Sequence, residues 1–556
     1  MATGSFDRAT ALERLGAETF DVLVIGGGIT GAGVALDAAS RGLRTALVER
    51  DDFASGTSSK SSKLVHGGLR YLQNGDVRLV YEALRERQRL RRNAPHLVRL
   101  LPFLIPVFSR DGLINPKVAR ALGSAMWMYD LTGGARIGKL HKRLKKAKAL
   151  AYMPTLPEER LAAAYLYYDA AADDARLTLT ILRTAALDHG AVVANHTQVV
   201  ELLHESGRAT GATVEADGRR FDVRARTVVN ATGVWSDDVR ALDEGHHPDS
   251  IRPAKGIHIT VPWDKVRNDI AVVVPVPKDK RSVFVVPWLP LDEGGFELTY
   301  IGTTDTDHDG SLDDPQCTSE DVAYLLRAIN ASVREPLTES DVLGTWAGLR
   351  PLVKAAASGR TADLSRRHKV TRSPSGVITV TGGKLTTYRE MAEDTVDELV
   401  RHVDGLPRSA RRCHTARLKL RGAQTTPSGL TGVARHLADR YGAEAPQVQS
   451  LIDADPSLGQ PLVPGLPYVR AEVVHAARQE MATTVDDVLA RRTRARLQAR
   501  DASAAIAPAV GELLAAELGW SPQETERQVG AYLALVEAER SAPGLSPTAD
   551  GSAVVP

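Results

Sequence analysis

Residues 20–31 read FDVLVIGGGITG, an apolar run that ends in closely spaced glycines. The run predicts a buried strand, and the small, amphipathic residues 31–41 that follow predict a helix. Gly26, Gly28 and Gly31 occupy the first, third and sixth positions of a dinucleotide-binding fingerprint. We expect Gly26 to permit a tight turn, Gly28 to admit a pyrophosphate and Gly31 to let the helix pack closely on the sheet.

A second predicted strand ends at Glu49, roughly 20 residues after the glycines, where a carboxylate binds ribose hydroxyls in sites of this kind. The N-terminus of the helix offers free N–H groups and the positive end of a dipole to phosphates. Strand, helix, strand and acid together predict a βαβ unit that binds a dinucleotide. The competing interpretation is a glycine-rich turn without a ligand, and the motif alone does not distinguish FAD from NAD.

Composition narrows the class of protein. The chain has 556 residues, 43% of them hydrophobic, which predicts two or three domains. Its 70 Lys and Arg residues balance 68 Asp and Glu residues, so nothing indicates a nucleic-acid binder. Cys317 and Cys413 are far apart, which excludes a disulfide framework and a Cys-based zinc site and fits a reducing cytosol. We find no secretory signal and no run of roughly 18 apolar residues that would span a membrane.

Three later segments favour FAD. Residues 55–71, SGTSSKSSKLVHGGLRY, form a polar run with glycines that can wrap a phosphate chain and admit a flat ring, although a solvated linker has a similar composition. Residues 227–233, TVVNATG, predict a buried strand ending in small residues. Residues 381–389, TGGKLTTYR, predict a strand-to-helix turn whose helix N-terminus could face the flavin N1–C2 carbonyl and favour the reduced anion.

These segments closely resemble the FAD-dependent glycerol-3-phosphate dehydrogenases, a family of D-amino-acid-oxidase-like flavoproteins. The resemblance runs in order from about residue 20 to residue 389 and includes SSKLVHGGLRYL, VNATGVWSD, KGIHI, VPW, IGTTDTD, AGLRPL and GGKLTTYR. Residues 486–493 resemble the family's C-terminal domain more loosely. The resemblance implies oxidation of sn-glycerol 3-phosphate to dihydroxyacetone phosphate, with the C2 hydride passing to flavin N5.

The resemblance leaves the electron acceptor open. Electrons pass to a membrane quinone in the dehydrogenases and to oxygen in the oxidase branch, which typically carries an inserted segment. That segment has no obvious counterpart here, which favours the dehydrogenase and keeps an oxygen-using glycerol-3-phosphate oxidase as the alternative. A non-catalytic FAD-binding or nucleic-acid-modifying flavoprotein is the other class, which the nearly neutral charge disfavours.

The predicted fold class is α/β, with a Rossmann-type FAD-binding domain, an antiparallel-sheet substrate domain and an all-α C-terminal domain. Residues 251–304 are rich in Val, Ile, Phe and Trp and predict the antiparallel sheet, and Ala, Leu, Arg and Glu dominate after about residue 405. We place the boundaries at 20–100, 165–245 and 345–400 for the FAD-binding domain, 101–164 and 246–344 for the substrate-binding cap, 405–540 for the helical domain and 541–556 for a disordered tail.

The substrate is a phosphate dianion with a C2 hydroxyl, so the site needs cations and a group that takes the hydroxyl proton. By resemblance, Arg70 contacts the phosphate or the substrate and Arg350 lies beside the reacting carbon. Lys384 binds substrate or stabilises reduced flavin, Tyr71 lines the pocket, and Arg366 is a weaker candidate for the phosphate. Taken alone, each arginine is more often a surface or structural residue.

Two histidines complete the predicted catalytic set. His258, in KGIHI, is placed at the substrate as the general base or a substrate ligand, because a neutral imidazole near pH 7 suits a base. A histidine on an apolar strand is as easily a core residue. His66 is expected to contact the flavin and is the second candidate for the base. The residues expected to hold FAD are Gly26, Gly28, Gly31, Glu49, Thr57, Ser58, Ser61, Ser62, Gly67, Ala231, Gly233, Gly383, Lys384, Leu385 and Thr386.

A basic segment raises the question of membrane contact. Residues 131–157 contain no Asp or Glu and include KLHKRLKKAK at 139–148, after apolar and aromatic stretches at 101–108 and 126–129. This composition is typical of a membrane-surface patch, although a solvated helix beside core segments would also show it.

The expected partners are glycerol 3-phosphate, a quinone or other electron acceptor and an anionic membrane surface; a homodimer stays open and no nucleic acid is expected. We therefore expect a cytoplasmic protein, peripheral on the inner face of the cell membrane.

Overall fold

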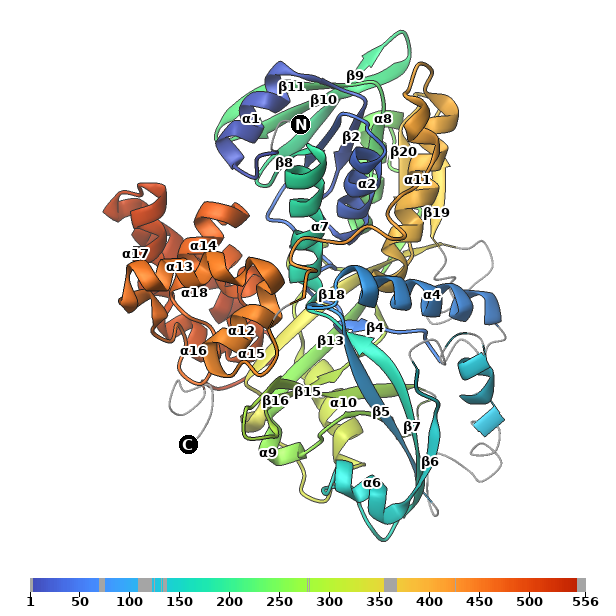
Figure 1. The fold of residues 1–556 in the computed structure, drawn as a ribbon, viewed down its shortest axis with the longest axis vertical. Coiled ribbons are helices and arrows are strands. Elements are labelled where there is room, and N and C mark those ends of the chain that lie inside the picture. The colour runs from blue at the N-terminus through green and yellow to red at the C-terminus, as the bar shows by residue number, and fades with distance from the viewer. Residues whose placement is uncertain are drawn as a thin grey trace.

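The computed structural model describes residues 4–69, 76–108, 123–124, 126–131, 133, 138–277, 279, 281–354, 368–425 and 427–547. A domain with a parallel sheet lies at the top of Figure 1, a large, mainly antiparallel sheet lies below it, and a cluster of helices lies beside both. The predicted α/β fold, with a Rossmann-type domain, an antiparallel-sheet domain and a helical C-terminal domain, is confirmed.

The parallel sheet grows outward from the glycine-rich strand. All four side chains of that strand, β2, are buried, so both faces of the sheet must be covered. In order, the sheet contains β19 (Lys369–Arg372), β20 (Ile378–Thr381), β12 (Val228–Asn230), β2 (Val22–Ile25), β3 (Thr45–Val48) and β8 (Val192–Ala194). Its pairs are parallel except for β19 with β20, which places the carboxyl ends of β2, β3 and β12 at one edge.

Three helices cover one side of this sheet. α2 (Ile29–Ser40) begins at the glycine turn, and its small side chains let it pack between α7 (Asp174–His189) and α11 (Tyr388–His402) (Figure 1). A four-stranded sheet contacts β2 and β12; it contains β1 (Thr19–Phe20), β11 (Arg219–Ala225), β10 (Arg208–Ala216) and β9 (Gln198–Glu205). The connecting helices are α1 (Arg8–Ala17), α4 (Val77–Asn93), α6 (Lys146–Tyr152), α8 (Ser236–Glu244) and α9 (Trp263–Val266).

The second sheet is large and mainly antiparallel. Its main path is β17 (Thr306–Asp307), β13 (Ile251–Pro262), β16 (Phe296–Gly302), β15 (Ser282–Pro290), β14 (Ala271–Pro275), β5 (Arg99–Phe108), β7 (Leu161–Ala171) and β4 (Leu64–Val65). β18 (Gly344–Val353) pairs with β13, and β6 (Lys142–Lys145) pairs with β7. The pairing is antiparallel except between β14 and β5.

Alternation along the strands gives this sheet two different faces. Ile257, Ile259 and Val261 of β13 join one core cluster with the buried side of α10 (Ser319–Asn330). His258 lies on the opposite face of β13, and β13 pairs antiparallel with β18. Because the register sets His258 opposite Trp346, polar and aromatic side chains collect on the face turned away from α10.

The helical domain packs directly on the large sheet. Its helices are α12 (Gly432–Tyr441), α13 (Ala445–Ala454), α14 (Ala471–Glu480), α15 (Ala495–Gln498), α16 (Arg500–Ala505), α17 (Ala507–Leu518) and α18 (Pro522–Ser541). Its core cluster also contains Leu298 of β16, with Trp288 and Leu289 of β15 packed against it. The helical domain is therefore joined to the large sheet by one shared hydrophobic core.

The structure departs from several sequence-based expectations. The expected strand 192–203 divides into β8 and β9, with His196 between them at φ 47°, a left-handed conformation that breaks a ladder. Residues 101–108, expected at a membrane surface, form the buried strand β5. The expected tail began at residue 541, yet α18 includes Ser541 and Leu545 is 7% exposed in the core beside α10. Among the described residues, no helix combines the length and the apolar character that crossing a bilayer requires.

Candidate active site

The glycine fingerprint lines a cavity of about 510 Å³ at the edge where the parallel strands end. This volume suits a cofactor-sized ligand. Eleven of the residues expected to hold FAD line it: Gly26, Gly28, Glu49, Thr57, Ser58, Ser61, Ala231, Gly233, Gly383, Lys384 and Leu385. Segments that are far apart in the sequence therefore meet around one cavity.

The glycine turn has the geometry that a pyrophosphate needs. Gly26 has φ 108°, a conformation that side chains disfavour, and a Cβ on Gly31 would collide with the Gly26 carbonyl oxygen. A Cβ on Gly28 would stand 3.1 Å from Ser58 Oγ, which already accepts a hydrogen bond from the Ile29 N–H at 2.8 Å. Gly28 itself lines the cavity, so its backbone is open to a ligand there, and these residues fit FAD.

Glu49 directly follows β3, the second strand of the βαβ unit. Its carboxylate accepts hydrogen bonds from the Gly27 N–H at 2.6 Å and the Asp51 N–H at 2.9 Å. Burial raises the pKa of Glu49, and the two backbone donors oppose that shift. The side chain also lines the cavity, where a ribose hydroxyl could reach it.

An ion-pair network fixes the loop between the cavity and the large sheet. Lys63 Nζ donates to Ser59 O and to Asp174 Oδ1, both at 3.0 Å, and Asp174 Oδ2 accepts from the Ser61 N–H at 3.0 Å and hydroxyl at 2.6 Å. Arg494 of the helical domain donates to the same Asp174 Oδ1 at 3.1 Å. Burial and the charge of Arg494 together lower the pKa of Lys63 to about 8, although the carboxylates of Asp174 and Asp173 oppose the shift.

His258 lies under this loop and is 2% exposed. Its Nε2 is 2.8 Å from Ser62 Oγ, and its ring stacks on Trp346 with centroids 4.7 Å apart and planes 9° apart. Burial holds the pKa of His258 well below 6.5, and the charges of Lys63 and Arg350 act in the same direction. His258 Nδ1 has no hydrogen-bond partner within the described part of the chain. A neutral ring with one uncommitted nitrogen can accept a proton.

Arg350 lies on the same face of β13 and β18 as His258. The ladder pairs Ala254 with Arg350 and His258 with Trp346, and residues four apart along a strand point the same way. Arg350 Nη1 is 3.2 Å from Asp305 Oδ1, and Nη2 donates to Thr303 Oγ1 and Thr304 O, each at 3.2 Å. The segment expected from the IGTTDTD motif thus fixes the direction of the guanidinium.

Two glycines make room for these side chains. A Cβ on Gly256 would lie 2.7 Å from Arg350 Nη1 and closer still to Nη2. A Cβ on Gly302 would overlap the His258 ring, with Nε2 2.7 Å away. Gly256 lies in KGIHI and Gly302 in IGTTDTD, but sequence reasoning gave neither a role.

His66 and Gly67 lie in a neighbouring turn rather than in the cavity wall. Thr386 Oγ1 accepts a hydrogen bond from the His66 N–H at 3.1 Å, which links this turn to the GGKLTTYR segment. The Gly67 N–H donates to Asp169 Oδ1 at 3.2 Å, and the Tyr129 hydroxyl donates to the same carboxylate at 2.7 Å. His66 and Thr386 therefore support the turn beside the cavity.

The structure describes only part of the predicted set of site residues. Lys384 lines the cavity, Ser62 and Arg350 are the sequence neighbours of the lining residues Ser61 and Pro351, and His258 contacts Ser62. Arg70, Tyr71 and Arg366 lie outside the described residues. The residues that sequence reasoning missed are Lys63, Asp169, Asp174, Asp305 and Trp346. Asp169 and Asp174 did carry a signal, because acids within an apolar segment such as LAAAYLYYDAAADDA must be paired when buried.

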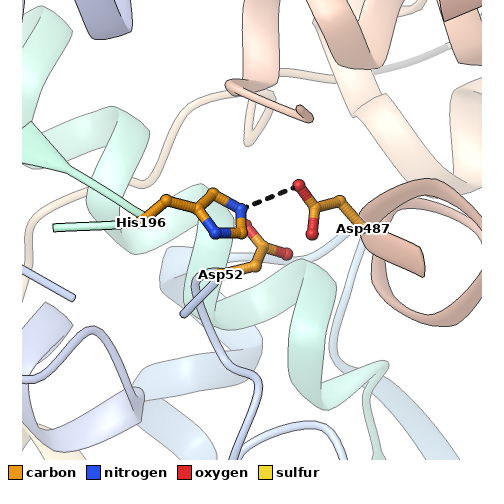
Figure 2. A group of neighbouring side chains, drawn as sticks. All are labelled: Asp52, His196 and Asp487. Carbon is orange, nitrogen blue, oxygen red and sulfur yellow. Dashed lines mark hydrogen bonds and ion pairs between the residues drawn. The ribbon is translucent and has the colours of Figure 1, made fainter. Parts of the chain in front are cut away.

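A separate cluster of Asp52, His196 and Asp487 joins the parallel-sheet domain to the helical domain (Figure 2). His196 Nε2 is 3.1 Å from Asp487 Oδ2, and Asp52 pairs with Arg492 at 2.6 Å and Arg491 at 2.5 Å. Burial alone would lower the pKa of His196, but the Asp487 carboxylate raises it. Because two guanidinium groups already neutralise the carboxylates, the cluster is a structural link rather than a cation site.

Known proteins match this arrangement along nearly the whole chain. Residues 21–389 match the family of FAD-dependent oxidoreductases, and residues 413–525 match the C-terminal domain of alpha-glycerophosphate oxidase. Over 554 residues the chain is 42% identical to glycerol-3-phosphate dehydrogenase 2 of Mycobacterium tuberculosis, covering 97% of this chain and 92% of that protein. Over 542 residues it is 38% identical to the human mitochondrial glycerol-3-phosphate dehydrogenase, covering 92% and 72%.

A solved structure agrees. The glycerol-3-phosphate dehydrogenase of Bacillus halodurans, complexed with FAD, is 30% identical and superposes with a TM-score of 0.75, covering 96% of this chain and 98% of that one. The cofactor of this fold is FAD, as the glycine turn and its cavity indicate. The chain belongs to the family of FAD-dependent glycerol-3-phosphate dehydrogenases.

Proposed function

We propose that this protein oxidises sn-glycerol 3-phosphate to dihydroxyacetone phosphate. The observation that carries the proposal is His258, a buried and neutral imidazole that shares one face of the sheet with Arg350 and contacts Ser62, the sequence neighbour of the cavity-lining Ser61. Bound FAD supplies the acceptor for the hydride that leaves C2. His258 takes the proton of the C2 hydroxyl, so the alcohol loses one hydride and one proton and becomes a ketone.

Three cationic side chains, Arg350, Lys384 and Arg70, take the other roles in binding and catalysis. Arg350, oriented by Asp305 and Thr303, stabilises negative charge at the reacting oxygen. Lys384 lines the cavity on the turn that follows β20 and faces either the substrate or the flavin. We assign the phosphate to Arg70, with Tyr71 lining the pocket and Arg366 as a weaker contact, on the strength of the sequence motif alone.

Anaerobic mixing with substrate tests the proposal. Glycerol 3-phosphate should bleach the flavin absorbance rapidly, whereas glycerol, which lacks the phosphate, should bleach it far more slowly. Equal rates with both alcohols would contradict the assignment of a phosphorylated substrate. Absence of bleaching with either would support a flavoprotein of another kind.

A quinone is the proposed electron acceptor. One observation favours the alternative, an oxygen-using oxidase, because residues 413–525 match a domain described for alpha-glycerophosphate oxidase. Peroxide release in air separates the two activities. Stoichiometric peroxide at the rate of substrate oxidation would establish the oxidase; traces of peroxide together with fast reoxidation by quinone would establish the dehydrogenase.

We also propose a cytoplasmic protein attached peripherally to the inner face of the cell membrane. Trp127, Leu131 and Leu140 are 56%, 82% and 47% exposed, and exposed basic residues of β6 and α6 follow directly in the sequence. Apolar anchors beside Lys and Arg suit an anionic lipid surface. Replacing the lysines of residues 139–148 with glutamine should release the protein from anionic vesicles at low salt without loss of flavin. Failure of the unaltered protein to sediment with such vesicles would refute the attachment.

A further inference from the structure

The loop that ends at β4 is held over His258 by aromatic side chains of the large sheet. The Ser61 carbonyl accepts a hydrogen bond from Trp346 Nε1 at 3.3 Å, and the Ser62 carbonyl accepts one from the Tyr300 hydroxyl at 2.9 Å. Tyr300 belongs to β16 and Trp346 to β18. The backbone of the loop is therefore attached to the two strands that pair with β13, which carries His258.

Lys63, the last residue of this loop, has a backbone conformation that side chains disfavour, with φ 56°. Its N–H donates to Ser61 Oγ at 3.0 Å, and its ammonium group donates to the Ser59 carbonyl and to Asp174. Arg494 of the helical domain donates to the same carbonyl and to the same carboxylate. Backbone of this kind persists where its surroundings fix it, and it is concentrated at functional sites. The network therefore holds the loop in a conformation that the loop alone would not favour.

This arrangement presents the Ser62 hydroxyl to the His258 ring. Ser62 Oγ lies 2.8 Å from Nε2, and a Cβ on Gly302 would lie 2.7 Å from the same nitrogen. Trp346 stacks on one face of the ring, with the two planes 9° apart. One edge and one face of the imidazole are thus occupied, so the ring cannot turn without breaking these contacts. Nδ1 is the ring nitrogen that has no hydrogen-bond partner within the described ranges.

The buried Nδ1 indicates which nitrogen of His258 carries the hydrogen. In one tautomer Nδ1–H would be a buried donor without an acceptor, and such donors are rare because they lose their hydrogen bond to water. In the other tautomer Nε2–H donates to Ser62 Oγ, and Nδ1 presents only a lone pair. Buried acceptors are left unpaired more often than buried donors are. The second tautomer is also the one in which Nδ1 can take a proton.

The ionisable side chains that act on the His258 ring come from three elements: Lys63 from the loop, Arg350 from β18 and Tyr300 from β16. Both cations disfavour an imidazolium ion, although each has a carboxylate partner, Asp174 and Asp305 respectively. Burial raises the pKa of Tyr300, which keeps its hydroxyl neutral. In the described part of the chain, the group that meets Nε2 is the Ser62 hydroxyl and not a carboxylate. A hydroxyl oxygen is therefore the acceptor available to the ring when it becomes charged.

We propose that Ser62 is a positioning residue that holds His258 in the Nε2–H tautomer, so that Nδ1 takes the proton of the C2 hydroxyl. The inference rests on the proposed function and deepens it, since Ser62 was expected only to hold FAD. As the O–H bond of the substrate breaks, an Nδ1–H bond forms and the imidazole becomes a cation, while the C2 hydride leaves with its electron pair to the FAD that the fold binds. The hydrogen bond from Nε2–H to Ser62 Oγ then becomes charge-assisted and therefore stronger.

Replacing Ser62 in the holoenzyme tests this role. Ser62→Ala removes the acceptor, and Ser62→Thr keeps a hydroxyl group at the same position. Ser332→Ala is the matched control, because it removes a buried serine hydroxyl that has no hydrogen-bond partner among the described residues. In anaerobic stopped-flow experiments at saturating glycerol 3-phosphate, flavin reduction should slow roughly 3- to 30-fold in Ser62→Ala, because a hydrogen bond that strengthens on charging is lost. Ser62→Thr and Ser332→Ala should reduce their flavin at close to the wild-type rate, and KM should change little in all three.

A double-mutant cycle tests whether the loop acts through Ser62. Tyr300→Phe removes the hydroxyl that holds the Ser62 carbonyl and keeps the ring. Tyr532→Phe is the control, because it loses a buried hydroxyl that lies 2.7 Å from Ser503 Oγ in the helical domain. Tyr300→Phe should slow flavin reduction less than Ser62→Ala does, and the double variant should show the Ser62→Ala rate, since both changes act on one contact. Defects that multiply in the double variant would overturn the positioning of His258 through this loop.

The pH dependence of flavin reduction distinguishes the two tautomers. Loss of an acceptor destabilises the protonated ring and lowers the pKa of His258, so the rate of Ser62→Ala should begin to decline at a pH no higher than in wild type. If Ser62 instead donated to Nε2, its loss would raise that pKa and move the decline towards pH 6.5. Such an upward shift would overturn the tautomer, and a wild-type rate in Ser62→Ala would overturn the role of Ser62. Failure of glycerol 3-phosphate to reduce the flavin of the wild-type enzyme would instead overturn the proposed function.

Discussion

Replacing Gly256 with alanine should slow catalysis by displacing Arg350 while leaving the fold intact. The new Cβ would lie 2.7 Å from Arg350 Nη1 and 2.7 Å from Thr303 Oγ1, well inside an ordinary contact of about 3.5–4.0 Å. The nearest atoms belong to the flexible end of the arginine, so the guanidinium can move aside. It would then lose its contacts with Asp305 and Thr304, each 3.2 Å long.

The size of the effect follows from the hydrogen bond that the displaced Arg350 guanidinium would no longer make to the reacting oxygen. A charge-assisted hydrogen bond contributes about 1.5–3 kcal/mol, so flavin reduction at saturating glycerol 3-phosphate should slow roughly 10- to 150-fold. Stopped-flow absorbance under anaerobic conditions measures this rate directly, and a reduced kcat with little change in KM would indicate a transition-state contact. Gly530→Ala is the control, because no atom lies within 4 Å of its Cβ and alanine favours the helix. Wild-type reduction in Gly256→Ala would refute the placement of Arg350 at the reacting carbon.

Three further changes address the base, the loop and the cofactor. His258→Ala should slow flavin reduction by about 10²–10⁴-fold, with a defect that shrinks at high pH, where hydroxide partly replaces the base. Because burial keeps the pKa of His258 below 6.5, the wild-type rate should persist as the pH falls through that value and decline only at lower pH; a decline centred at 6.5 would contradict a buried base. Asp174→Asn should lower the free energy of unfolding by about 3–5 kcal/mol, since Lys63 and Arg494 would lose a buried partner; denaturant titration measures this, and unchanged stability would show that the network is not formed. Gly28→Glu should yield colourless protein, because its side chain would occupy and repel the pyrophosphate position; a full complement of flavin after purification would disprove that role.

The local parts of the fold were predictable from the sequence. The strand, glycine turn and helix at residues 22–40 follow from neighbouring residues, because each signal acts within a few positions. The antiparallel sheet and the helical domain followed from composition and patterning. The break at His196 was not predictable, since its left-handed backbone depends on contacts with Asp51 and Asp487, far away in the sequence.

The candidate site was predictable as a set of motifs but not as a geometry. The motifs named His258 and Arg350, yet only the register of β13 and β18 shows that they share a face with Trp346, which pairs with His258 across the two strands. The environment of Lys63 depends on Asp174 and Arg494, which are 111 and 431 positions farther along the chain. No periodicity in the sequence reports a contact of that range.

The arginines of the π-helical turn Asp487–Arg492 and of α15 have a consequence for how the molecule unfolds. Arg492 neutralises Asp52 and Arg494 neutralises Asp174, so two carboxylates beside the nucleotide cavity rely on the last third of the chain. A protein shortened before residue 487 would leave both acids buried without their guanidinium partners. The helical domain therefore depends on the same ion pairs as the nucleotide-binding domain. The two domains should unfold together in one cooperative transition.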